Sequence, residues 1–272
     1  MWRIGLKVVA VVAALVSSAQ ATEPDLKMLS TADANKGWEA VGRLNIGRSG
    51  FCTGALIAPH LVLTAAHCLF DQATGAPVDL SEIEFLAGWR NGRAEAYRGI
   101  KRAVLHPEYD FDGPDRMERV EYDLALMELD QPVRLTGIQP FATGLRPRKG
   151  DEVGVVSYAQ SRSEAPSLQE TCDVLGRSGS ILMLSCDVNF GASGAPIFSF
   201  DEGAPRIVSV ISSKASSGNK PIALGTAVEK PLAVLQKRLA NGEYIVSQSR
   251  PSIRQFGQGS ARSQVGAKFV RP

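Results

Sequence analysis

Leu63-Thr64-Ala65-Ala66-His67-Cys68 is the stretch of this sequence that decides the fold. The apolar residues up to Leu63 indicate a strand, and the two small alanines permit a tight turn after it. His67 would leave the strand at this turn, where a disulfide from Cys68 to Cys52 could hold it in place. A histidine fixed in this way can activate a serine hydroxyl if a carboxylate sets its tautomer. Such a role requires a serine and an aspartate elsewhere in the chain.

Two further segments supply these partners. Asp123 stands directly before the apolar run Leu124–Leu126, which suits a partly buried carboxylate that needs a hydrogen-bonding partner. Ser193 lies between Gly191-Ala192 and Gly194, which leave room for a substrate backbone and have N–H groups free to face a developing negative charge. His67, Asp123 and Ser193 are therefore the predicted catalytic residues.

These segments resemble the chymotrypsin-like serine proteases. In that family the histidine sits in Thr-Ala-Ala-His-Cys, the aspartate in Asp-Leu/Ile-Ala-Leu and the serine in Gly-x-Ser-Gly-x-Pro, and the order His, Asp, Ser also matches. The resemblance implies two packed six-stranded antiparallel β-barrels with a C-terminal helix. His67 and Asp123 would come from the first barrel and Ser193 from the second. It also implies an oxyanion hole built by the N–H groups of Gly191 and Ser193, and no cofactor.

The remaining two histidines are not expected to take part in catalysis. His106 lies in residues 104–109, which resemble a structural strand-and-turn stretch of the family, and His60 follows Pro59 as a surface turn residue.

One position separates this chain from the animal digestive members of the family. Those proteins pair a newly cut N-terminus with an aspartate just before the serine, but here Ala192 stands at that position. No Ile-Val-Gly-Gly type of N-terminus occurs near residues 35–45. Residues 186–196 look closer to the bacterial glutamyl-endopeptidase-like (V8-like) branch, although Val188 and Phe190 replace its usual Thr and Pro. We expect a protein that is catalytically competent once it is folded and freed of its signal peptide.

The sequence allows more than one interpretation of the residues that select the substrate. Asp187 lies six residues before Ser193, where trypsin-like enzymes keep a carboxylate for Arg or Lys, but it could equally be structural. The opposite wall should come from residues 211–215, in which Ser212 would contact the substrate backbone and Asp123. Lys214 in this wall could favour an acidic side chain or could only face solvent.

The organisation of the chain is that of an all-β protein. Short β-rich segments separated by Gly and Pro turns run through most of it. Leucines at spacings of three and four predict one amphipathic helix near its end. The expected parts are an N-terminal segment (22–39), a first barrel (40–140), a second barrel (141–228), a helix (229–241) and a disordered tail (247–272).

Residues 1–21 have the charged start, apolar run and small-residue end of a signal peptide. The alternative is a membrane anchor, but the apolar stretch is shorter than the roughly 18 residues that a spanning helix needs. We expect a secreted or periplasmic protein with no stable membrane insertion after cleavage. The cysteines form two local couples, and we expect disulfides within each of them: Cys52 with Cys68 and Cys172 with Cys186.

The expected partner is a polypeptide substrate. The net charge of +2 is nearly balanced, and no basic run interleaved with aromatic residues suggests a nucleic-acid surface. A metal site is the rival reading of the cysteines, but neither couple has the spacing of zinc ligands and the chain has 3 histidines. We expect no metal, and a monomer.

Two other functions compete with a serine endopeptidase. A protease-like binding protein that has lost catalysis would commonly lack one of the three residues, yet all are present. An esterase of the α/β type would need Gly-x-Ser-x-Gly, but Ala195 stands where the second glycine belongs, and the order of its triad would be Ser, Asp, His.

Overall fold

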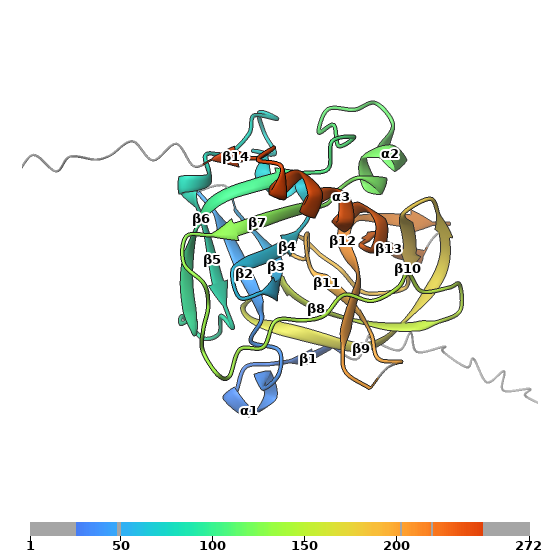
Figure 1. The fold of residues 1–272 in the computed structure, drawn as a ribbon. Helices are drawn as coiled ribbons and strands as arrows, with labels where there is room; N and C mark the ends of the chain where they lie inside the picture. Colours follow the sequence, from blue (N-terminus) through green and yellow to red (C-terminus); the bar gives the residue numbers. More distant parts are fainter. Residues whose placement is uncertain (1–25, 48–49, 202, 219, 247–272) are drawn as a thin grey trace, which may run out of the picture.

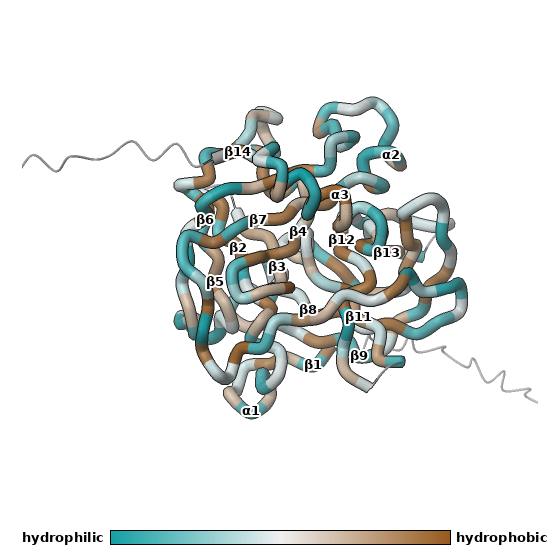
Figure 2. The backbone as a smooth tube through the Cα atoms, in the orientation of Figure 1, coloured by the Kyte–Doolittle hydropathy of each residue, from teal (hydrophilic) through white to brown (hydrophobic). Residues whose placement is uncertain are grey.

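Short antiparallel strands account for most of the molecule (Figure 1). The computed structural model describes residues 26–47, 50–201, 203–218 and 220–246, so the predicted signal peptide and tail lie outside the described residues. Figure 2 shows that polar residues gather in the outer loops. Among the described residues, no helix is long and apolar enough to cross a membrane.

The first sheet closes into a barrel because β6 pairs with both β5 and β7. The strand order around the ring is β6-β5-β2-β3-β4-β7. Its strands are β2 (Val41–Ile46), β3 (Gly50–Ala58), β4 (Leu61–Thr64), β5 (Ile83–Ala87), β6 (Ala96–Leu105) and β7 (Ala125–Leu129).

The second sheet closes in the same way, because β8 pairs with both β11 and β9. The strand order around this ring is β8-β9-β10-β13-β12-β11. Its strands are β8 (Glu152–Ala159), β9 (Arg162–Ser178), β10 (Ile181–Leu184), β11 (Pro196–Ser199), β12 (Arg206–Ser217) and β13 (Lys220–Ala227). The predicted pair of six-stranded antiparallel barrels is therefore confirmed.

Helices are short except at the C-terminal end. The predicted helix is present as α3 (Glu229–Ala240), and it buries Leu232 and Leu235 where it packs on β6 and β7 of the first barrel. Pro231 sits in its first turn, where a missing N–H is harmless. The other helices are α1 (Ala32–Asn35), η1 (Ala66–Leu69), η2 (Leu80–Glu82) and α2 (Arg116–Glu121).

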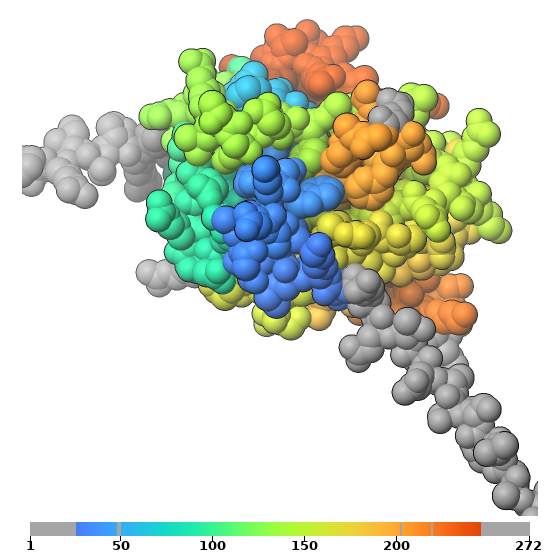
Figure 3. Space-filling view, turned by 90° about the horizontal axis from the view of Figure 1, so that it is seen from below, coloured from blue at the N-terminus to red at the C-terminus, as the bar shows by residue number. Residues whose placement is uncertain are grey.

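Each end of the described chain is attached to the barrel farther from it in sequence. β1 (Leu26–Met28) adds to β9 of the second barrel, and β14 (Ile245–Val246) adds to β6 of the first. Figure 3 shows the N-terminal residues, in blue, lying between the first barrel and the yellow strand β9. Leu29 follows β1 and is buried in the larger core, to which both barrels contribute. These two attachments hold the barrels together from outside.

Leu29→Ala should destabilise the protein by about 2–5 kcal/mol, because it removes a leucine side chain that is 1% exposed. The measurement is the free energy of unfolding in urea. The matched control is Met28→Ala, one residue earlier on a side chain that is 53% exposed, which should change stability by about 0.5 kcal/mol or less. Equal effects of the two substitutions would show that the N-terminal segment does not dock as described.

Candidate active site

A cleft of about 770 Å³ contains His67, Asp123 and Ser193 in its wall. His67 comes from η1 directly after β4, Asp123 from the end of the loop between β6 and β7, and Ser193 from the loop between β10 and β11. The structure thus brings together the three residues that the sequence singled out, from both barrels.

His67 and Asp123 are joined twice. The backbone N–H of His67 donates to Asp123 Oδ1 at 2.9 Å, and His67 Nδ1 lies 2.6 Å from Asp123 Oδ2. Ser212 Oγ donates to Asp123 Oδ2 at 2.5 Å, so the predicted contact between Ser212 and the aspartate is present. These three hydrogen bonds satisfy a carboxylate whose side chain is 3% exposed and fix the orientation of the imidazole.

Burial of the imidazole opposes its protonation, but the negative charge of Asp123 and the hydrogen bond to it together outweigh this and raise the pKa of His67. His106 differs, since burial lowers its pKa and its ring stacks on Tyr122. His106 is buried and is not among the residues of the cleft wall, and His60 lies in the exposed turn before β4.

The loop that carries Ser193 is held against the first barrel by Thr53 of β3. The Thr53 N–H donates to the carbonyl of Ser193 at 2.8 Å, and its hydroxyl donates to the carbonyl of Gly191 at 2.9 Å. The same hydroxyl accepts the N–H of Tyr158 at 3.1 Å. One buried residue of the first barrel therefore contacts both the serine loop and β8 of the second.

Between Gly191 and Ala195, two N–H groups have no acceptor in the described part of the chain. The N–H of Ala192 donates to Asn189, that of Gly194 to Ile211 and that of Ala195 to Ala192. The N–H groups of Gly191 and Ser193 are left without a partner beside the serine. They are the pair expected to form an oxyanion hole.

The two glycines of this loop are required by space and by conformation. Gly191 has a φ of 95° and a side chain there would overlap the ring of Phe51. Gly194 has a φ of 78°, and a methyl group on it would overlap the hydroxyl of Thr64 and the carbonyl of Thr53. Ala192 between them is fully buried, and its methyl side chain has no group that could pair with a charged N-terminus.

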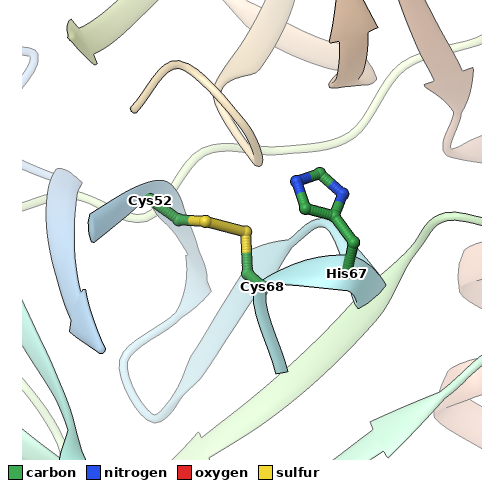
Figure 4. Close-up of side chains that lie close together, drawn as sticks. All are labelled: Cys52, His67 and Cys68. Atoms are coloured by element: carbon green, nitrogen blue, oxygen red, sulfur yellow. A yellow bond between two sulfur atoms is a disulfide. The ribbon is translucent and has the colours of Figure 1, made fainter. Parts of the chain in front are cut away.

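Both predicted disulfides are present, joining Cys52 to Cys68 and Cys172 to Cys186. Figure 4 shows the first of these bonds beside the imidazole of His67, with His67 and Cys68 on the same short turn. These three residues also form a cluster of possible metal ligands, but the two sulfurs are bonded to each other and neither is a thiolate. The disulfide holds the turn that presents His67.

The predicted pocket residues take different places. Ser212 and Lys214 line the cleft, whereas Asp187 is not among the residues of its wall. The N–H of Asp187 donates to Gln169 Oε1 at 2.8 Å. Its carboxylate attracts the positive charge of Arg162, but burial has the larger effect and lowers the pKa of Arg162. The neighbouring disulfide to β9 draws this part of the loop toward Gln169.

Several cleft residues were not foreseen from the sequence. Aromatic side chains from separate parts of the chain line it, among them Phe51, Phe70, Tyr109 and Phe190, and so do Arg116 and Arg119. No local pattern marks these residues, because they meet only when β3 and three separate loops, one of them 106–124, come together in the fold.

A double barrel with histidine, aspartate and serine on one cleft is the arrangement of chymotrypsin-like proteins. The trypsin family matches residues 30–231, and the chain belongs to this family.

Among curated relatives, the chain is similar to a glutamyl endopeptidase of Bacillus licheniformis, with 25% identity over 150 residues, 55% of this chain and 45% of that protein. It is also similar to a modular serine protease of Drosophila melanogaster, with 34% identity over 93 residues, 32% of this chain and 14% of that protein. The aligned part thus spans less than half the length of these relatives. A solved structure titled "Structure of Glu endopeptidase in complex with MPD" has the same fold, with a TM-score of 0.66, 16% identity and coverage of 80% of this chain and 98% of that one.

Thr53→Val should destabilise the protein by about 2 kcal/mol or more, since it leaves the carbonyl of Gly191 and the N–H of Tyr158 without the hydroxyl that pairs with both. Unfolding in urea measures this. Thr53→Ser keeps the hydroxyl and is the control; a loss as large as that of the valine variant would assign the effect to packing instead.

The pKa of the His67 imidazole should lie above 6.5 and fall below 6.5 in Asp123→Asn, where burial acts without the carboxylate. Nuclear magnetic resonance titration of the histidine Cε1 protons in a Ser193→Ala background measures it, with His60→Gln and His106→Gln to assign the signals. Because the pKa is raised by folding, the ion pair adds stability at pH values below about 6.5 that is lost as the pH rises through the raised pKa. An unchanged pKa in the asparagine variant would contradict the assignment.

Proposed function

We propose that this protein is a serine endopeptidase in which Ser193 is the nucleophile, His67 the general base and acid, and Asp123 the residue that orients the histidine. The observation that carries the proposal is the double hydrogen bond between His67 and Asp123 in the cleft that also holds Ser193. Because Asp123 binds Nδ1, the other ring nitrogen, Nε2, is left for the serine proton.

The reaction follows from these positions. Ser193 Oγ attacks the carbonyl carbon of the peptide bond while His67 Nε2 takes its proton. The oxygen of the tetrahedral intermediate is then negative, and the free N–H groups of Gly191 and Ser193 stabilise it, each worth about 3 kcal/mol in comparable sites. The intermediate collapses as His67 returns the proton to the leaving amine. Water then attacks the acyl-enzyme by the same route and releases the second product.

An extended peptide has an open strand edge on which to lie. β11 pairs with β12 as far as Val210, and beyond it β12 continues to Ser217 with β13 as its partner on the other side. Ser212 and Lys214 of this stretch line the cleft, where the carbonyl of Lys214 accepts from Arg116. A peptide could add to this edge as a further strand, with main-chain hydrogen bonds giving affinity and neighbouring side chains giving specificity.

The structure gives no support for a preference for Arg or Lys directly before the cleaved bond. It rested on Asp187, which faces Gln169 and Arg162 and does not line the cleft. The relative named glutamyl endopeptidase also points away from basic residues. We infer that the substrates are polypeptides cleaved without a requirement for a basic residue before the bond.

Separate features support export and activity without a second cut. Both disulfides would persist in an oxidising compartment, and residues 1–21 have the pattern of a signal peptide. The buried methyl of Ala192 replaces the acid that digestive members use to sense a new N-terminus. The serine loop is held instead by Thr53.

Ser193→Ala should abolish labelling by a fluorophosphonate and reduce kcat on casein by about a million-fold, because the nucleophile is removed. Gel fluorescence and release of soluble peptide measure the two effects. Ser81→Ala, at an exposed serine in η2, is the control and should keep full activity. The absence of Ser193-dependent labelling would favour the binding-protein alternative, and hydrolysis of short esters without casein cleavage would favour an esterase.

A further inference from the structure

The charged residues of the cleft wall are almost all cationic. Apart from His67 and Asp123, which are bonded to each other, they are Arg116, Arg119 and Lys214. In the described part of the chain, none of these three forms an ion pair with a carboxylate. A peptide-binding cleft with positive charges and no acid to neutralise them favours negatively charged ligands.

Arg116 and Lys214 meet across the cleft. Arg116 Nη2 donates to the backbone carbonyl of Lys214 at 2.8 Å, which places a guanidinium from the first barrel at the edge of β12 in the second. This bond uses one of the five donors of the guanidinium and none of the three of the Lys214 ammonium. Both side chains are exposed, so these donors can reach a ligand.

The acidic residues near Arg116 in sequence do not form an ion pair with it. Asp115 caps α2, with its carboxylate accepting the N–H groups of Met117 and Glu118. Glu118 lies two residues after Arg116 on the helix, and residues at that spacing do not face each other. Arg119 points back into its own loop, where it donates to the carbonyl of Phe111 at 3.1 Å. The available positive charge is therefore that of Arg116 and Lys214.

The geometry of β12 determines which residue of a bound peptide lies beside Lys214. Ser212 is bonded to Asp123 and so lies next to the proposed catalytic residues. Lys214 is two residues further on, a rise of about 6–7 Å, which is also the length of two residues of an extended peptide. A peptide residue beside Lys214 is thus about two residues away from the one beside Ser212. The site is separate from the pocket for the residue at the cut.

We propose that Arg116 and Lys214 form a second specificity site that selects peptides with an Asp or Glu two residues away from the residue at the cleaved bond, on the side that lies along β12. This inference rests on the proposed endopeptidase function and names a substrate class for it. A carboxylate there would replace solvent around two cations and could accept from both.

The test uses a library of peptides from digested cell proteins, with cleavage sites identified by mass spectrometry. For the wild type, we expect Asp and Glu to be enriched about 3- to 10-fold at one position two residues from the cut residue. The enrichment should shrink when NaCl is raised from 20 to 500 mM. In Arg116→Glu, the preference for Asp and Glu should be lost, because the new carboxylate offsets the positive charge of Lys214. Equal frequencies of acidic and neutral residues in the wild type would overturn the proposal.

Controls separate a charge effect from a damaged fold. Glutamate is favoured in the first turn of a helix, where Arg116 stands, so Arg116→Glu should fold. Arg116→Gln and Lys214→Gln remove charge without reversing it and should each reduce the enrichment. Arg134→Glu, at an exposed arginine outside the cleft wall, should leave it unchanged. An enrichment that survives in both Arg116 variants would also overturn the proposal.

A binding measurement keeps this inference distinct from the catalytic one. If the wild type cuts no peptide, the proposed function fails, and the charge site is tested in Ser193→Ala by fluorescence anisotropy. The probes are a labelled ten-residue peptide with three glutamates and its glutamine twin. We expect at least 3-fold tighter binding of the glutamate peptide, lost in the double variant with Arg116→Glu; equal affinity of the twins would contradict the second site.

Discussion

The interaction on which the rest of the site depends is the set of hydrogen bonds made by Thr53. This residue is fully buried in the first barrel, and it bonds the carbonyls of Gly191 and Ser193 and the N–H of Tyr158, all from the second. Since His67 belongs to the first barrel, its distance from Ser193 is set by this contact between barrels. Buried polar groups in such a network must all be paired, which makes the relative position of the barrels specific.

In the serine loop, the hydrogen bonds of Thr53 help to position the N–H groups of the proposed oxyanion hole. Thr53 can approach the loop closely because Gly194 has no side chain. The hydroxyl of Thr64 donates to the carbonyl of Thr53 at 2.9 Å. With the two carbonyls held by Thr53, the N–H of Ala192 bonds within the turn and that of Gly194 donates to Ile211 of β12, which leaves the N–H groups of Gly191 and Ser193 unbonded. Donors that are fixed in advance need no reorganisation when charge develops, which is the condition for an effective oxyanion hole.

Much of this could be predicted from the sequence because it is local. The apolar strand and small turn before His67, the acid before an apolar strand and the glycines around Ser193 are each written in a few adjacent residues. The attachment of β1 to β9 could not be foreseen, since it joins residues about 140 positions apart and its three-residue strand has no pattern of its own. The place of Asp187 was also hidden: its spacing from Ser193 suits a pocket, but Gln169 and the disulfide from Cys186 draw it away.

The loop 106–124 joins catalysis and selection in one element. It carries Asp123 near its end, and its backbone is fastened to the second barrel through Val120 and Glu121: Thr226 Oγ1 donates to the carbonyl of Val120 at 2.6 Å, and the N–H of Ser180 donates to Glu121 at 2.9 Å. The side chain of Arg116 adds a bond to the carbonyl of Lys214. These contacts fix α2, so Arg116 is carried by the same support that positions the carboxylate behind His67. A substitution that loosens the loop would disturb both the orientation of the imidazole and the cationic edge of the cleft. The two can be separated only by changing side chains, such as that of Arg116, that take no part in fastening the loop through Val120 and Glu121.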